Sequence, residues 1–176
     1  MPYDRPYSVE ETKQILDASE HRPRPDIPGG AGKTGHAISR HTLERRNVFD
    51  REVPKDDIFG ISRNSLVPII HEVLNSPAGQ RELRKLNQKT KLRVQIRSVI
   101  LRQNADLDIF TVYRPEREGA QTYFDWLSTT KGEGYIVQVY VLVIKIPRSS
   151  SDGIHIQTAF PEDFARTFGN EIVRPS

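Results

Sequence analysis

The stretch YIVQVYVLVIKI (residues 135–146) determines the fold class of this 176-residue chain and is its longest apolar run. From Val139 onward, both faces of an alternating strand would be apolar, which is typical of a central strand covered on both sides. The run is too short and too rich in β-branched residues for a membrane helix. We therefore predict a central strand here, and we expect no membrane insertion of the folded protein.

Weaker strand patterns flank this run. In residues 92–97, apolar residues alternate with Arg, Gln and Arg, which predicts a strand with one basic face exposed to solvent. Residues 108–113 and residues 154–160 also have strand character. In the last segment, His155 and Gln157 fall on one face. Simple alternation places four other residues on the opposite face, namely Ile154, Ile156, Thr158 and Phe160.

Helical patterns precede the strands. Ser8 and Glu11 form a capping box that predicts a helix over residues 9–18. A second helix is expected from about residue 35 to Arg46. Its first half carries the histidines discussed below.

Two further helices are predicted before the strands. One begins near Asn64 and carries an apolar stripe, and the other begins at Pro77 after the cap Ser76. A short helix is also expected from Pro161 to the stop signal Gly169. Helices first and strands after them indicate an α+β protein, with N-terminal helices packed on a central antiparallel sheet.

Residues 20–35 are rich in Pro, Gly and Arg and lack periodicity, which predicts an extended linker. We therefore divide the chain into an N-terminal helix with its linker (residues 1–34) and a main domain (residues 35–176). GGAGKTGH at the end of the linker is no phosphate-binding loop. Ile27 stands where such a loop needs its first glycine, and no strand pattern precedes it.

The composition limits the possible chemistry. The chain has no cysteine, so disulfides, thiolate metal sites and a cysteine nucleophile are excluded. The net charge of +3 allows an acidic partner such as nucleic acid without requiring one. We expect no metal and no cofactor, because histidines five apart on a helix do not point together and no HEXXH motif is present.

The second predicted helix carries the strongest chemical signal. His36 and Arg40 share one of its faces, His41 lies on a neighbouring face, and Arg45 and Arg46 follow one turn later. An imidazole among guanidinium groups suits phosphodiester cleavage, because the imidazole accepts a proton and the arginines neutralise charge on the phosphorus. The alternative is a surface helix whose histidines only add polarity.

Two motifs add a resemblance. GHAISRHT near the start and TAFP in the last strand resemble the bacterial toxin ribonucleases of the pancreatic-ribonuclease-like class, and more loosely the barnase and colicin-type nuclease toxins. The former occur as C-terminal domains of contact-dependent growth-inhibition proteins and other polymorphic toxins. The resemblance places the catalytic histidine at His36, the arginine at Arg46 or Arg45, and the threonine at Thr158. Phe160 stands where such toxins have tyrosine, and a base could stack on its ring.

The resemblance implies that residues 35–176 form a ribonuclease-like toxin domain. It would be a metal-independent endoribonuclease that cleaves RNA, with tRNA as one candidate, to a 2′,3′-cyclic phosphate. His36 would be the general base, with Arg46 and Thr158 holding the scissile phosphate. Arg40, Arg45, Arg93, Arg97 and Phe160 would bind substrate, and His155 is a reserve general acid.

The same resemblance implies biological partners. The toxin would be secreted or delivered from a producing cell and would act in the cytoplasm of a target cell. A cognate acidic immunity protein that covers His36 would protect the producer. Two alternatives remain: a non-catalytic nucleic-acid or protein-interaction module with a basic sheet face, and an ADP-ribosyl or nucleotide transferase.

Overall fold

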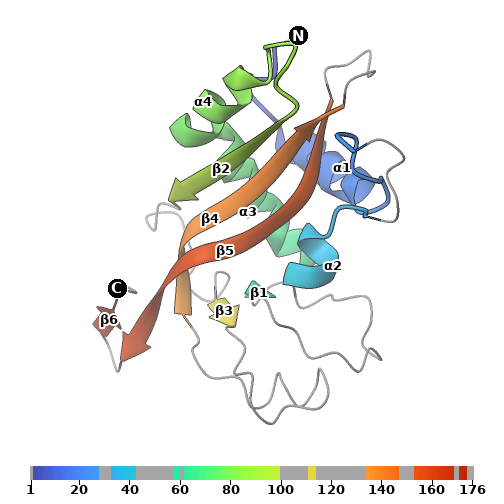
Figure 1. The fold of residues 1–176 in the computed structure, drawn as a ribbon. Coiled ribbons are helices and arrows are strands. Elements are labelled where there is room, and N and C mark those ends of the chain that lie inside the picture. The colour runs from blue at the N-terminus through green and yellow to red at the C-terminus, as the bar shows by residue number, and fades with distance from the viewer. Residues whose placement is uncertain are drawn as a thin grey trace.

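A computed structural model gives the fold shown in Figure 1. It describes residues 2–27, 33–42, 58–59, 62–99, 111–113, 134–146, 153–168 and 171–173. The helices are α1 (Val9–Ser19), α2 (Ala37–His41), α3 (Arg63–Asn75) and α4 (Pro77–Lys85). The strands are β1 (Ile58–Phe59), β2 (Arg93–Val99), β3 (Thr111–Tyr113), β4 (Gly134–Lys145), β5 (Ile154–Phe168) and β6 (Glu171–Val173).

All pairs of strands in the sheet are antiparallel, and β4 is its centre. β4 pairs with β2, β3 and β5, while β1 extends the sheet beyond β3 and β6 extends it beyond β5. This confirms the α+β class, with helices mostly N-terminal, and the central position of residues 135–146. No helix in the described part of the chain combines the length and apolar character needed to cross a membrane.

The helix starts follow from local side-chain chemistry. The Ser8 hydroxyl accepts a hydrogen bond from the backbone N–H of Glu11 at 3.0 Å, as the capping box predicts. Ser76 caps α4 in the same way, by accepting from Gly79 N–H at 3.0 Å, and Pro77 occupies the first helical position. The helices predicted at residues 9–18 and at Pro77 are therefore confirmed.

The helix predicted from Pro161 is wrong, because β5 continues as a strand to Phe168. The register of β5 against β4 is irregular here, with Val139 opposite Pro161 and Gln138 opposite Asp163. A proline, which has no N–H for the ladder, is tolerated at such an irregularity. Pairing with the long central strand therefore overrides a local signal for a helix start.

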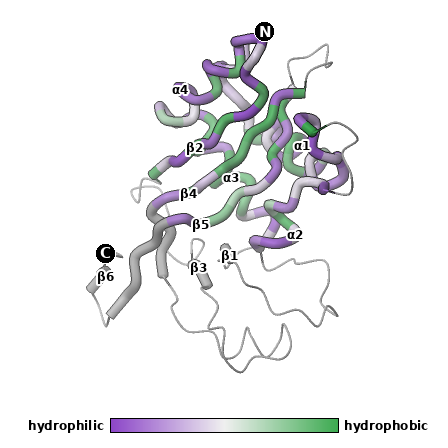
Figure 2. Tube along the Cα trace, in the orientation of Figure 1, coloured by the Kyte–Doolittle hydropathy of each residue, from purple (hydrophilic) through white to green (hydrophobic). Residues whose placement is uncertain are grey.

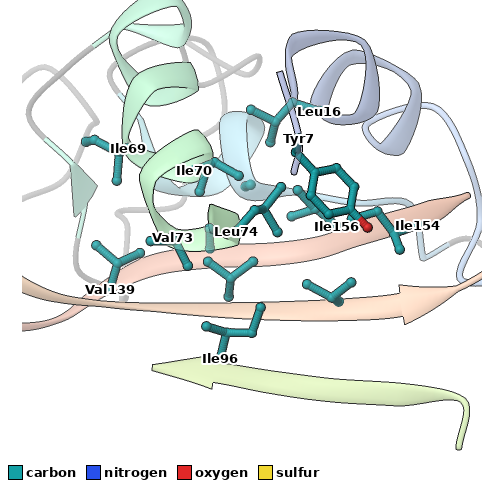
Figure 3. Packing of buried hydrophobic residues seen from close by; sticks show 14 of the residues in the cluster. Tyr7, Leu16, Ile69, Ile70, Val73, Leu74, Ile96, Val139, Ile154 and Ile156 are labelled. Atoms are coloured by element: carbon teal, nitrogen blue, oxygen red, sulfur yellow. The ribbon is translucent and has the colours of Figure 1, made fainter. Parts of the chain in front are cut away.

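The hydrophobic core lies between α3 and the sheet (Figure 3). Side chains of α3 such as Ile70, Val73 and Leu74 point toward β4 and β5, and they are fully buried. From the sheet, the side chains on the face toward α3 contribute: Val94, Ile96, Val139, Val141, Val143, Ile154, Ile156 and Ala159. Figure 2 shows hydrophobic residues concentrated along β4 and β5, and mixed polarity along β2.

The N-terminal segment belongs to the same core. Tyr7 and Leu16 are buried beside α3 (Figure 3). The Tyr7 backbone exchanges two hydrogen bonds with the Asn75 side chain, at 2.9 and 3.0 Å, and its hydroxyl donates to the Tyr3 carbonyl at 2.7 Å. Helix α1 is thus packed as an integral part of the fold, while the functional division at residue 34 stays a prediction.

Replacing Leu74 by alanine should lower the free energy of unfolding by about 2–5 kcal/mol, because it removes a fully buried side chain from the centre of the core. Leu92 is 40% exposed and provides the same substitution as a matched control. Urea denaturation followed by circular dichroism measures both variants. Equal losses at the two positions would contradict the described core.

Candidate active site on the open face of the sheet

The face of the sheet opposite α3, which we call the open face, is exposed along β2, where it carries basic residues, whereas Ile144, His155 and Thr158 of β4 and β5 are buried on it. Val94 and Ile96 are buried on the core side, while Arg93, Gln95 and Arg97 are exposed, as the alternation in residues 92–97 predicts. Cross-strand partners share a face. The register therefore sets three rows across β2, β4 and β5: Arg97–Tyr140–Phe160, Gln95–Leu142–Thr158 and Arg93–Ile144–His155.

A bulge at Gln157 brings β5 into these rows. Ile156 pairs with Val143 and Thr158 pairs with Leu142, so Gln157 is the extra residue without a partner on β4. The prediction that Ile154, Ile156, Thr158 and Phe160 share one face is therefore wrong. After the bulge, Thr158 and Phe160 lie on the open face, and Ala159 enters the core instead.

The bulge also anchors the segment that carries His36. The backbone N–H of His36 donates to the Gln157 carbonyl at 2.9 Å. The Gln157 side-chain amide donates to the Thr34 carbonyl at 2.9 Å. His36 is thus fixed by its backbone to the residue that immediately precedes Thr158.

Gly35 allows this close approach. Its N–H donates to the Ser19 carbonyl at 2.9 Å, and the Ser19 hydroxyl in turn accepts from Ile156 N–H at 3.0 Å. A Cβ at position 35 would lie 2.5 Å from the Ser19 carbonyl oxygen and 2.7 Å from that of Ile156. Both are backbone atoms that cannot move aside cheaply, so only glycine fits here.

Glu20 holds helix α2 in place. Its Oε1 accepts hydrogen bonds from the backbone N–H groups of Ile38 and Ser39, at 2.6 and 2.8 Å, where a helix N-terminus has unpaired donors. Glu20 and Ile38 are both buried. Sequence reasoning missed this residue, because a cap supplied eighteen positions upstream leaves no local signal.

Rings from α2, β5 and β4 form a continuous row. The ring centroids of His36 and His41 are 5.7 Å apart, and those of His41 and Phe160 are 5.4 Å apart. Phe160 stacks on Tyr140 at 4.7 Å, and the Arg97 guanidinium carbon lies 5.0 Å from the Tyr140 ring centroid. The predicted residues His36, Phe160 and Arg97 therefore belong to one row.

Two members of this row had no predicted role. His41 belongs to the GHAISRHT motif, but its place in the site depends on the exact bounds of α2, which the sequence does not define. Tyr140 lies within an apolar run and gives no separate signal. Burial raises the pKa of Tyr140, which keeps its phenol protonated.

Thr158 lies beside the row, and its hydroxyl is buried. The side chain is 8% exposed, and Oγ1 has no hydrogen-bond partner among the described residues. A buried hydroxyl without a partner costs about 1–3 kcal/mol, which an oxygen of a ligand could recover by accepting its proton. The hydroxyl is therefore a donor without a partner in the described part of the chain, and a ligand would have to displace the covering side chains to accept from it.

The basic residues of the open face form ion pairs with carboxylates. Arg97 Nε lies 2.8 Å from Glu162 Oε1, and Arg93 Nη1 lies 3.2 Å from Asp26 Oδ2. Asp26 also binds Arg24 at 2.8 Å, and this hydrogen bond is the main cause that lowers the pKa of Asp26. Part of the predicted linker thus packs on the sheet, and the two predicted phosphate ligands already bind anionic groups.

The other predicted arginines are not brought together by the described structure. Arg40 is exposed on α2. Arg45 and Arg46 lie outside the described residues, so their predicted roles keep the status of predictions. Within the described ranges, no three His, Cys, Asp or Glu side chains gather as a metal-binding group.

His155 is fully buried on β5. Its Nε2 lies 2.9 Å from Gln157 Oε1, and since the Gln157 amide nitrogen donates to Thr34, this oxygen accepts the imidazole proton. Burial lowers the pKa of His155, which disfavours the imidazolium that a general acid needs. The geometry suits a structural support of Gln157 better than the reserve role in catalysis.

Comparisons of the chain with protein-family models, with curated proteins and with solved structures each give no match. The functional conclusion therefore depends on the open face itself. Its elements are two neighbouring imidazoles, a buried hydroxyl without a partner and a basic strand.

The lowered pKa of His155 should make stability depend on pH. Below about pH 6.5 the unfolded chain binds a proton at this residue more readily than the folded protein does, so the free energy of unfolding falls. The effect is absent above the unfolded pKa and grows as the pH falls toward the folded one.

His155→Gln removes this group and should flatten the pH dependence of the free energy of unfolding between about pH 7 and pH 5. Urea denaturation at a series of pH values measures the slopes. Identical slopes in the parent and in His155→Gln would exclude a buried neutral imidazole.

Proposed function

We propose that this protein is a metal-independent endoribonuclease toxin that cleaves RNA by attack of the 2′-hydroxyl, giving a 2′,3′-cyclic phosphate and a 5′-hydroxyl. The observation that carries the proposal is the hydrogen bond between His36 N–H and the Gln157 carbonyl. It fixes the early histidine one residue from Thr158, on a face that also carries Arg97. These are three of the residues that the resemblance and the charge pattern select independently.

In the proposed reaction, His36 is the general base. A neutral imidazole accepts the 2′-hydroxyl proton as the oxygen attacks phosphorus. The Thr158 hydroxyl would donate to a non-bridging oxygen of the same phosphate. The hydroxyl would then have the hydrogen-bond partner that it lacks among the described residues. Arg46 or Arg45, by resemblance alone, would add positive charge to the site.

Single-stranded RNA would extend from this site across the open face. β2 lies two strands from β5, about 10 Å away. Arg93 and Arg97 would then contact phosphates next to the scissile one, and the exposed Arg40 would lie near His36. Phe160 has Tyr140 and His41 as ring neighbours, so it would align the site more than bind a base.

The toxin role and its partners follow from the resemblance. Delivery from a producing cell, action in the cytoplasm of a target cell and a cognate acidic immunity protein belong to this proposal. An acidic inhibitor would suit a face with exposed cations at Lys91, Arg93 and Arg97. Cleavage of tRNA or bulk RNA after expression without the inhibitor would support it.

A non-catalytic RNA-binding module is the second candidate, because the basic face alone would serve it. His36→Ala separates the two. If the protein is a ribonuclease, this variant should cleave a short RNA about 10²–10⁴-fold more slowly, since it lacks the general base. Gel analysis of labelled RNA measures the rate and identifies the cyclic phosphate.

The matched control is His21→Ala, which removes an exposed histidine outside α2 and β5 and should cleave at the parental rate. All assays include EDTA. No cleavage by the parent protein would reject the nuclease, unchanged cleavage by His36→Ala would remove this residue from the mechanism, and cleavage that EDTA abolishes would reject metal independence.

The carboxylates on the open face lead to a further prediction. Glu162 competes with phosphate for Arg97, so Glu162→Gln should strengthen RNA binding, while Arg97→Ala should weaken it and lower the salt slope by about 1. Fluorescence anisotropy with the His36→Ala background, which prevents cleavage, measures both across a salt series. Tighter binding by Arg97→Ala would place RNA elsewhere.

A further inference from the structure

We propose that His41 is the general acid of this reaction and protonates the 5′-oxygen of the leaving nucleotide. The inference rests on the proposed ribonuclease function, which needs a proton donor as well as a base. The resemblance leaves this donor unassigned, because the tyrosine of such toxins is replaced by Phe160 in this chain.

The first step of the argument is the spacing of the two imidazoles. α2 is a single short helix with His36 as its N-cap residue and His41 as its last residue. The expectation that these histidines do not point together is wrong, because the backbone of His36 is not helical (φ −144°, ψ 22°) and the ring centroids lie 5.7 Å apart, with the ring planes inclined by 37°. At this spacing, one phosphate group would reach both rings, as in-line displacement with a separate base and acid requires.

The second step is the place of His41 beside Phe160. The two ring centroids are 5.4 Å apart, so an imidazole lies next to the position that lacks the hydroxyl. His41 is 4% exposed and is held within the structure, whereas His36 is half-buried. A donor whose ring is fixed in place suits a proton transfer that must be aligned with a breaking bond.

The competing donor is the phenol of Tyr140. Tyr140 stacks on Phe160 from β4, whereas α2 contacts β5 from the other side (Figure 1). The Arg97 guanidinium also lies over its ring, 5.0 Å from the centroid. Because His36 neighbours His41, the geometry favours the imidazole as the partner of the base.

The proton balance is complete with these two residues. Neutral His36 takes the proton from the 2′-hydroxyl while the 2′-oxygen forms its bond to phosphorus. The bond between phosphorus and the 5′-oxygen breaks, and His41 in its imidazolium form gives its proton to that oxygen. His36 ends protonated and His41 neutral, and exchange with water restores both.

The test compares two substrates that differ only in the leaving atom. One is a short RNA with a natural 5′-oxygen, and the other has sulfur at this bridging position, which leaves without protonation. His41→Asn should cleave the oxygen substrate about 10²–10⁴-fold more slowly than the parent and the sulfur substrate at nearly the parental rate. His36→Asn should be slow on both, and His21→Asn should be normal on both.

The sulfur substrate also reports whether His41→Asn is folded, and His41→Gln provides a second variant of different size, with assays run below the melting midpoint of each. Slow cleavage of both substrates by folded His41 variants would overturn the inference. If Tyr140→Phe, and not the His41 variants, cleaves the oxygen substrate slowly and the sulfur substrate at nearly the parental rate, the general acid would be Tyr140. An inactive parent protein would reject the ribonuclease proposal itself.

Discussion

The hydrogen bond from His36 N–H to the Gln157 carbonyl is the contact on which the open face depends. It exists because Gln157 is the extra residue of a bulge, and its backbone lies outside the ladder between β5 and β4. The same bulge turns Thr158 and Phe160 out of the core. One irregular residue therefore sets both halves of the site: it turns Thr158 and Phe160 of β5 toward the open face and anchors His36 beside them.

The sequence predicts the regular parts of this fold, because they follow from local periodicity and capping. The alternation in residues 92–97, the apolar run of residues 135–146 and the capping residues Ser8 and Ser76 appear in the structure as expected. The end of β5 could not be predicted in this way. Alternation cannot reveal a bulge, and the helix signal at Pro161 is local, whereas pairing with β4 depends on residues more than twenty positions away.

The sequence predicts only part of the candidate site, because the site also depends on contacts between distant segments. His36 and Thr158 are separated by more than a hundred residues, and only a motif could connect them before the sheet register was known. Glu20 and Tyr140 carry no motif, and their places follow from contacts between distant segments. The pairing of Arg93 with Asp26 and of Arg97 with Glu162 was equally hidden, since a charge pattern shows cations without showing which carboxylates face them.

The packing of α1 has a mechanical consequence. Ser19 at the end of α1 accepts the hydrogen bond from Gly35 and also binds Ile156, so the helix, the loop before α2 and the bulged strand are joined at one point. A pulling force applied to the N-terminus would draw Tyr7 and Leu16 out of the core and reach this junction while β2 and β4 were still paired. His36 and His41 would therefore be displaced early when the chain is unfolded from its N-terminus. They would return to their places only after α1 had packed on the core again.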